Sequence, residues 1–136
     1  MAADAGPDNR SMQGLHLTAD LRGCAAGRPM MTDTAALRIL CLDAVAGAGF
    51  TAVGELFHRF VPAPGQEHAP SGVTGVVLLA ESHLAVHTWP ELEAATLDVY
   101  VCNLGADNSA RAHSLMDALV AAFSPASIER HAHRRG

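Results

Sequence analysis

Residues 81–91, ESHLAVHTWPE, bring together side chains that can do chemistry. Ser82 offers a hydroxyl nucleophile, and His83 and His87 offer acid–base catalysis or metal binding near neutral pH. These residues directly follow GVVLLA, an apolar run typical of a buried strand. A zinc site and a serine hydrolase are therefore the first two chemistries to weigh.

A zinc site would use His83 and His87, which are four residues apart. Two histidines at this spacing share one face of a helix, but in a strand the same spacing covers about 13 Å, too far for one ion. Pro90 also makes a helix through this segment unfavourable. We therefore expect no metal here.

A hydrolase would use Ser82 as nucleophile and His87 as its base. No G-x-S-x-G turn surrounds the serine, and the charge of Glu81 would oppose a developing oxyanion. Cys102, at the end of a valine-rich run, is by its position alone a small core residue. The residue types alone thus leave this segment without a clear reaction.

Composition limits the classes of function. The chain has 136 residues, 49% of them hydrophobic, and a net charge of −5, which suits one globular domain. Its only basic cluster is ERHAHRRG at the C-terminus, so nucleic acid is not an expected partner. No apolar run is long enough to cross a membrane and no targeting segment is visible, so we expect a cytoplasmic protein. Three cysteines, Cys24, Cys41 and Cys102, cannot all be paired.

Hydrophobic periodicity predicts six strands and two helices. After a flexible leader at 1–13, period-two runs predict strands at 15–24, 50–60, 73–80, 83–89, 96–102 and over SIERHAHR. Helical periodicity predicts one helix behind an Asp33 or Thr34 cap, ended by Gly47 and Gly49, and a second from Asn108 or Ser109 to before Pro125. This order predicts an α/β protein of the α+β type: a two-layer sandwich whose antiparallel or mixed sheet carries both helices on one face. Residues 14–136 then form a single domain.

Three segments resemble one known family in order and spacing: FHRF (57–60), GVTGVVLLAESHLAVHTWPE (72–91) and LDVYVC (97–102). They are similar to the prokaryotic S-adenosylmethionine decarboxylases, and the likeness extends over about residues 14–130. The resemblance implies that the chain cuts itself between Glu81 and Ser82, leaving chains 1–81 and 82–136. Ser82 would become a pyruvoyl group, a self-made cofactor that forms a Schiff base with the substrate amine, so no external cofactor is needed.

The resemblance also implies roles for other residues. His87 would be the acid or base of self-cleavage, and Cys102 would return a proton to the carbon that loses CO₂. Thr74 stands where many relatives have a serine that supports cleavage, and we expect slower or unchanged cleavage from this change. Phe60 would stack on adenine, and Glu91 would hold the ribose hydroxyls.

The implied reaction is decarboxylation of S-adenosylmethionine to the aminopropyl donor of spermidine synthesis, by a homodimer of processed protomers. Two departures bear on the substrate: LEAAT replaces the common YGYAA after WPE, and VCN replaces TCG. A pyruvoyl-dependent ornithine or arginine decarboxylase therefore stays an alternative, as does an uncut regulatory or binding subunit. The loop at 61–71 is longer than in short relatives, with Glu67 and His68 as extra polar groups of no assigned role.

Geometry raises one difficulty for these roles. In an unbroken strand over 76–89, Ser82 and His87 would point to opposite faces and lie about 16 Å apart. The sequence therefore predicts either a turn or kink at 81–83 or a histidine supplied by a second subunit.

Overall fold

The computed structural model describes residues 13–136, so most of the predicted leader lies outside the described range. Within this range the order of strands and α-helices matches the prediction. The elements are β1 (Gly14–Arg22), η1 (Pro29–Met31), α2 (Thr34–Gly47), β2 (Gly54–Arg59), β3 (Val73–Leu79), β4 (Ser82–Trp89), η2 (Pro90–Leu92), β5 (Ala94–Cys102), α3 (Ser109–Phe123) and β6 (Ser127–Arg135).

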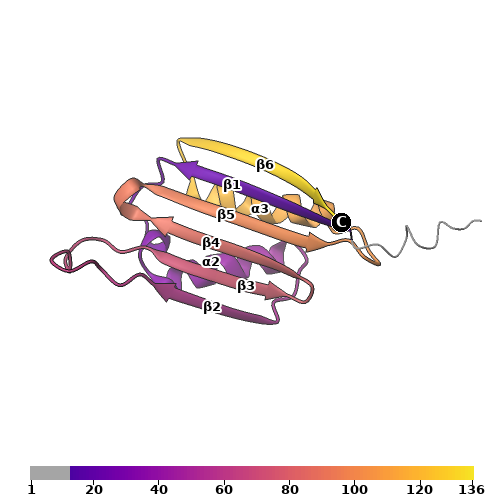
Figure 1. Ribbon diagram of the computed structural model, residues 1–136, viewed down its shortest axis with the longest axis horizontal. Coiled ribbons are helices and arrows are strands. Elements are labelled where there is room, and N and C mark those ends of the chain that lie inside the picture. The colour runs from indigo at the N-terminus through magenta and orange to yellow at the C-terminus, as the bar shows by residue number, and fades with distance from the viewer. Residues whose placement is uncertain (1–12) are drawn as a thin grey trace, which may run out of the picture.

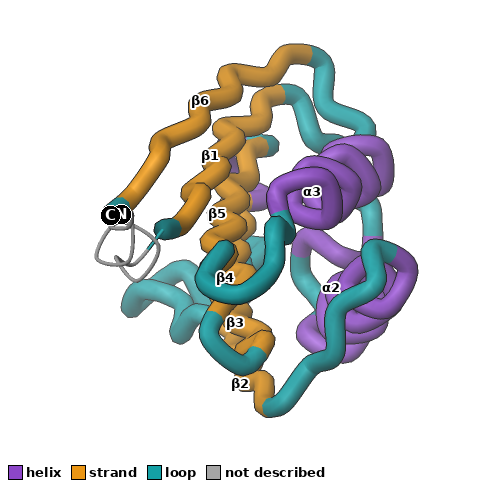
Figure 2. Tube along the Cα trace, turned by 90° about the vertical axis from the view of Figure 1, so that its right-hand side faces the viewer, coloured by secondary structure: helices purple, strands orange, loops and turns teal. Residues whose placement is uncertain are grey.

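The strands form one sheet in the order β2-β3-β4-β5-β1-β6, and every neighbouring pair is antiparallel. The first strand, β1, lies between β5 and β6, so the two ends of the domain are side by side (Figure 1). Both helices cover the same face of this sheet, and the other face carries no helix (Figure 2). The predicted two-layer α+β fold is confirmed, and the sheet is antiparallel rather than mixed.

Alternation along the strands places the core between the sheet and the helices. In β1, Leu17, Ala19 and Leu21 are buried, whereas His16 and Thr18 are only half-buried on the face without helices. The helices contribute their own buried residues to the same core: Leu37, Cys41 and Val45 from α2, and Leu115, Met116 and Leu119 from α3. No helix within residues 13–136 has the length and apolar character needed to span a membrane.

Element boundaries differ from the prediction where the backbone makes other bonds. The strand expected from residue 50 begins at Gly54, because the Phe50 N–H donates to the carbonyl of Val45 and so continues the exit from α2. The first strand ends at Arg22, because Gly23 has a φ of +73°, a left-handed conformation that turns the chain. At the start of α2, Asp33 is the N-cap as predicted, and its carboxylate accepts a hydrogen bond from the Ala35 N–H at 2.9 Å.

Candidate active site

The Glu81–Ser82 bond lies at the tip of a β-hairpin. Leu79 at the end of β3 pairs with Ser82 at the start of β4, so Ala80 and Glu81 form a two-residue turn. Both turn residues are exposed, and Ala80 has a φ of +59°, which costs a non-glycine residue about 1 kcal/mol. A cut between Glu81 and Ser82 would therefore leave the paired residues of β3 and β4 in place.

Ser82 contacts Cys102 across two neighbouring strands. The Ser82 Oγ accepts a hydrogen bond from the backbone N–H of Cys102 at 3.1 Å, and both residues are half-buried. The Cys102 sulfur itself accepts a hydrogen bond from the Leu104 N–H at 3.5 Å. The structure thus brings the hydroxyl of the predicted cleavage serine to the backbone of Cys102, which is far away in the sequence.

The end of β5 is anchored by the start of α3. Asn108 is the N-cap residue of α3, but its side chain does not cap the helix as predicted; it donates from Nδ2 to the Cys102 carbonyl at 2.9 Å. The capping bond comes from Asp107, whose carboxylate accepts from the Ser109 N–H at 2.9 Å. This hydrogen bond lowers the pKa of Asp107. This contact of Asn108 could not be predicted from the sequence, because only the fold brings the Cys102 carbonyl next to it.

His87 lies further along β4, on the face of the sheet without helices. Its Nδ1 is 3.0 Å from the Thr74 Oγ1, and the two residues face each other in the register of β3 and β4. The His87 ring also stacks on Trp89, with centroids 5.7 Å apart and planes at 27°. Thr74 and Trp89 together fix the orientation of the imidazole ring. The sequence alone indicates no role for Trp89, because stacking between side chains two residues apart in a strand cannot be inferred from composition.

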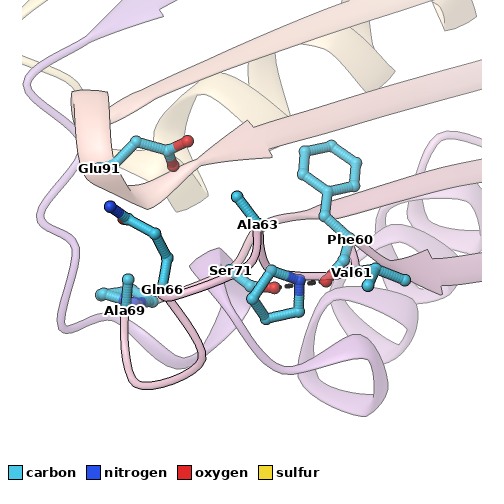
Figure 3. A pocket seen from close by; sticks show the side chains of 10 residues that line it. Phe60, Val61, Ala63, Gln66, Ala69, Ser71 and Glu91 are labelled. Atoms are coloured by element: carbon cyan, nitrogen blue, oxygen red, sulfur yellow. Dashed lines mark hydrogen bonds between the residues drawn. The ribbon is translucent and has the colours of Figure 1, made fainter.

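Phe60 and Glu91 line a cavity of about 200 Å³ (Figure 3). The Phe60 ring is 6.4 Å from the Trp89 ring, so this cavity adjoins the His87 group of side chains. Glu91 belongs to η2 and lies across the cavity from Phe60. The remaining wall is formed by the loop at 61–71. An aromatic ring opposite a carboxylate can bind a ligand that has both a planar ring, which stacks on the aromatic side chain, and hydroxyl groups, which donate to the carboxylate.

The site residues therefore form two groups within one chain. Ser82 and Cys102 lie at one end of β4, while Thr74, His87 and Glu91 lie toward its other end. The predicted turn lies one residue earlier, at Ala80 and Glu81, and β4 then runs unbroken through both groups. Ser82 and His87 are thus on opposite faces and roughly 16 Å apart by strand geometry. A turn does not bring them together.

The geometry gives no support to metal binding. Among residues 13–136, no three or more histidine, cysteine, aspartate or glutamate side chains are arranged to hold an ion. His83 and His87 lie in the same strand, and the His83 ring packs against Tyr100 with centroids 5.7 Å apart.

Comparison with known proteins gives a consistent result. The family model described as S-adenosylmethionine decarboxylase matches residues 15–136. The S-adenosylmethionine decarboxylase proenzyme of Aquifex aeolicus is 37% identical over 123 residues, covering 90% of this chain and 81% of the relative. The proenzyme of Symbiobacterium thermophilum is 37% identical over 126 residues, with 93% and 85% covered. The crystal structure of the adenosylmethionine decarboxylase from Aquifex aeolicus superposes with a TM-score of 0.76 at 36% identity, covering 92% of each chain. The chain belongs to the S-adenosylmethionine decarboxylase family.

Proposed function

We propose that this protein cuts itself between Glu81 and Ser82 and then decarboxylates S-adenosylmethionine, yielding the aminopropyl donor of spermidine synthesis. Family membership supports the reaction. The observation that carries the assignment to residues is the contact between Ser82 and Cys102 at the hairpin tip. Three free cysteines among residues 13–136 agree with a cytoplasmic location, since thiols stay unpaired under reducing conditions.

Self-cleavage begins at the Ser82 hydroxyl. Its oxygen attacks the carbonyl carbon of Glu81, which converts the peptide bond into an ester. Elimination across Cα and Cβ of Ser82 then releases the 1–81 chain with a C-terminal carboxylate and leaves dehydroalanine at residue 82. Water hydrolyses the imine form of dehydroalanine to the pyruvoyl group, and the nitrogen leaves as ammonia. The Cys102 N–H positions the attacking oxygen, and the exposed turn lets the new chain ends separate. These features fit a pyruvoyl group formed from Ser82, which supplies a carbonyl that withdraws electrons from the carbon losing CO₂.

Cys102 is proposed to protonate the substrate carbon after CO₂ leaves. It lies beside Ser82 at the end of β5, and its backbone is held on both sides, by Ser82 and by Asn108. This support fixes the backbone of Cys102 beside the residue that would carry the pyruvoyl group.

His87 is proposed to take up and return protons during self-cleavage, with Thr74 fixing its ring. Because β4 separates His87 from Ser82 of the same chain, we propose that each His87 serves Ser82 of a second copy in a homodimer. Each active site would then combine the Ser82 group of one protomer with the His87 group of the other.

Phe60 and Glu91 are proposed to bind the nucleoside: the ring stacks on adenine, and the carboxylate accepts hydrogen bonds from the ribose hydroxyls. Their cavity supports S-adenosylmethionine over ornithine or arginine, which have neither a planar heterocycle nor a ribose.

The test is the intact mass of the denatured protein after incubation with S-adenosylmethionine, ornithine or arginine and a reductant that fixes imines to amines. We expect two chains that meet at Glu81–Ser82, with only the 82–136 chain gaining mass and only from S-adenosylmethionine. A single chain of about the full 14.2 kDa that never gains mass would refute the proposal.

A further inference from the structure

The loop at 61–71 has a defined shape next to Phe60. The Ser71 hydroxyl is buried and donates to the Phe60 carbonyl at 2.6 Å, and the Phe60 N–H donates to the Gly72 carbonyl at 2.8 Å. Gly72 packs so closely on β4 that an added Cβ would collide with the Thr88 carbonyl oxygen. Both ends of the loop are thus fixed to the strands that carry the proposed site.

The tip of the loop is ordered by its own backbone. The Gln66 N–H donates to the Ala63 carbonyl at 2.9 Å, and the Gln66 carbonyl accepts from the Ala69 N–H at 3.0 Å. The Glu67 carboxylate accepts from the Gly65 N–H at 3.2 Å, and bonds to the N–H groups of Glu67 and Gly65 lower the pKa of Glu67. Gln66 therefore stands between two turns that do not involve its side chain.

The Gln66 side chain lines the cavity. Its amide end extends toward Glu91, while Phe60 stands on the other side of the cavity (Figure 3). A primary amide donates two hydrogen bonds and accepts others, which complements both the edge of adenine and the ribose hydroxyls. Apart from Ser71, whose hydroxyl already donates to the Phe60 carbonyl, the other loop residues along this wall are apolar: Val61, Pro62, Ala63, Ala69 and Pro70.

We propose that Gln66 is a specificity-determining residue that hydrogen-bonds the nucleoside of the substrate in the cavity between Phe60 and Glu91. The inference rests on the proposed function, because a nucleoside must be part of the substrate. Gln66 selects for the nucleoside since an amino acid without one leaves this amide without a partner in the cavity. The loop at 61–71 thereby becomes a wall of the substrate site.

The decisive variant is Gln66→Ala, which preserves every backbone bond of the loop tip. We expect it to self-cleave like wild type, to bind 5′-methylthioadenosine about 3- to 10-fold more weakly by calorimetry, and to show a KM for S-adenosylmethionine raised by the same factor with kcat unchanged. This probe carries the nucleoside and lacks the amino acid, so it reports on the cavity without the chemistry. Gln66→Glu keeps the size, removes the N–H donors and adds a charge facing Glu91, so it should bind at least as weakly.

His68→Ala is the matched control, because His68 belongs to the same loop but does not line the cavity. It should bind 5′-methylthioadenosine like wild type. Wild-type affinity in Gln66→Ala or Gln66→Glu, or an equal loss in His68→Ala, would overturn the role of Gln66 while leaving the proposed function intact. A wild-type protein that decarboxylates no S-adenosylmethionine would refute the proposed function itself, and with it this inference.

Discussion

Ser82 and His87 belong to one unbroken strand, β4, yet their side chains lie on opposite faces of it, five residues apart. Each has its own partner: the Cys102 N–H for Ser82 and the Thr74 hydroxyl for His87. Strand geometry separates the two by roughly 16 Å, so no side-chain rotation joins them. If both act in self-cleavage, they must come from different chains.

Mixed dimers test this arrangement. Ser82→Ala and His87→Ala should each fail to cleave or cleave at least about 100-fold more slowly when expressed alone. When the two are co-expressed, the His87→Ala chains should be cut, because their Ser82 meets an intact His87 from the other variant. Mass spectrometry of differently tagged chains identifies which variant is cut. If wild type is cut but no chain of the mixture is, His87 does not serve Ser82 of a second copy, and the proposed sharing between protomers is wrong.

Thr74→Val tests the hydrogen bond to His87. Valine has nearly the shape of threonine and suits a strand, so the change removes the hydroxyl and little else. Losing this bond should slow self-cleavage by roughly 2- to 10-fold, followed as the decay of uncut chain on a denaturing gel. Thr74→Ser keeps the hydroxyl and should cleave at the wild-type rate or faster. Thr96 faces His87 from β5, so Thr96→Val is the matched control and should cleave normally; equal slowing in both would point to packing instead.

Cys102→Ala should separate self-cleavage from turnover. The contact to Ser82 uses the backbone N–H of Cys102, which alanine retains, so the variant should still give two chains. Removal of the thiol should lower kcat by about 100-fold or more, since the substrate carbon loses its proton donor. The rate of CO₂ release measures kcat, and the proportion of correctly protonated decarboxylated S-adenosylmethionine among the products measures the loss of the proton donor. Full turnover in the cleaved variant would mean that Cys102 is not the proton donor and has only a structural role.

Much of the fold could be predicted because the hydrophobic period changes clearly along the chain. The strand alternation in 15–24 and the helical stripe behind Asp33 each correspond to an observed element. The predicted element boundaries were wrong where a backbone hydrogen bond overrode the hydrophobic pattern, as at Phe50, whose N–H donates to a carbonyl of α2. The turn at Ala80 and Glu81 has no glycine or asparagine to mark it, and the pairing of β3 with β4 imposes the left-handed conformation on Ala80.

The site was harder to predict than the fold, because its contacts depend on register. Cys102 and Ser82 meet only because β4 and β5 are neighbours in the sheet with a particular offset. The residue type of Asn108 predicts a helix cap. In the structure its side chain instead donates to the Cys102 carbonyl at the end of β5, and the Asp107 carboxylate caps the helix. The sequence does not indicate a role for Gln66, because the direction of its side chain follows from two turns within a loop.

Alkaline pH should weaken folding through Cys41. Burial raises the pKa of this thiol from 9.0 to about 12. Below pH 9 the thiol is neutral in both states and has no effect; above pH 9 the unfolded chain loses the proton first, so stability falls by at most about 1.4 kcal/mol per pH unit up to pH 12. Urea unfolding of uncut Ser82→Ala protein at several pH values measures this. Adding Cys41→Ala should flatten the decline, and an equally steep decline would assign it to other groups.

Strain at the hairpin turn should assist self-cleavage. Ala80 has a φ of +59°, a conformation that costs alanine about 1 kcal/mol relative to glycine. Because the turn opens when the chain is cut, this strain destabilises the uncut chain relative to the transition state. Ala80→Gly should therefore slow cleavage by about 2- to 5-fold, measured by pulse-labelling during refolding. Ser124, with a φ of +48° at the end of α3, is the control, and Ser124→Gly should leave the rate unchanged. Cleavage of Ala80→Gly at the wild-type rate or faster would mean that the turn's conformation is not coupled to the reaction.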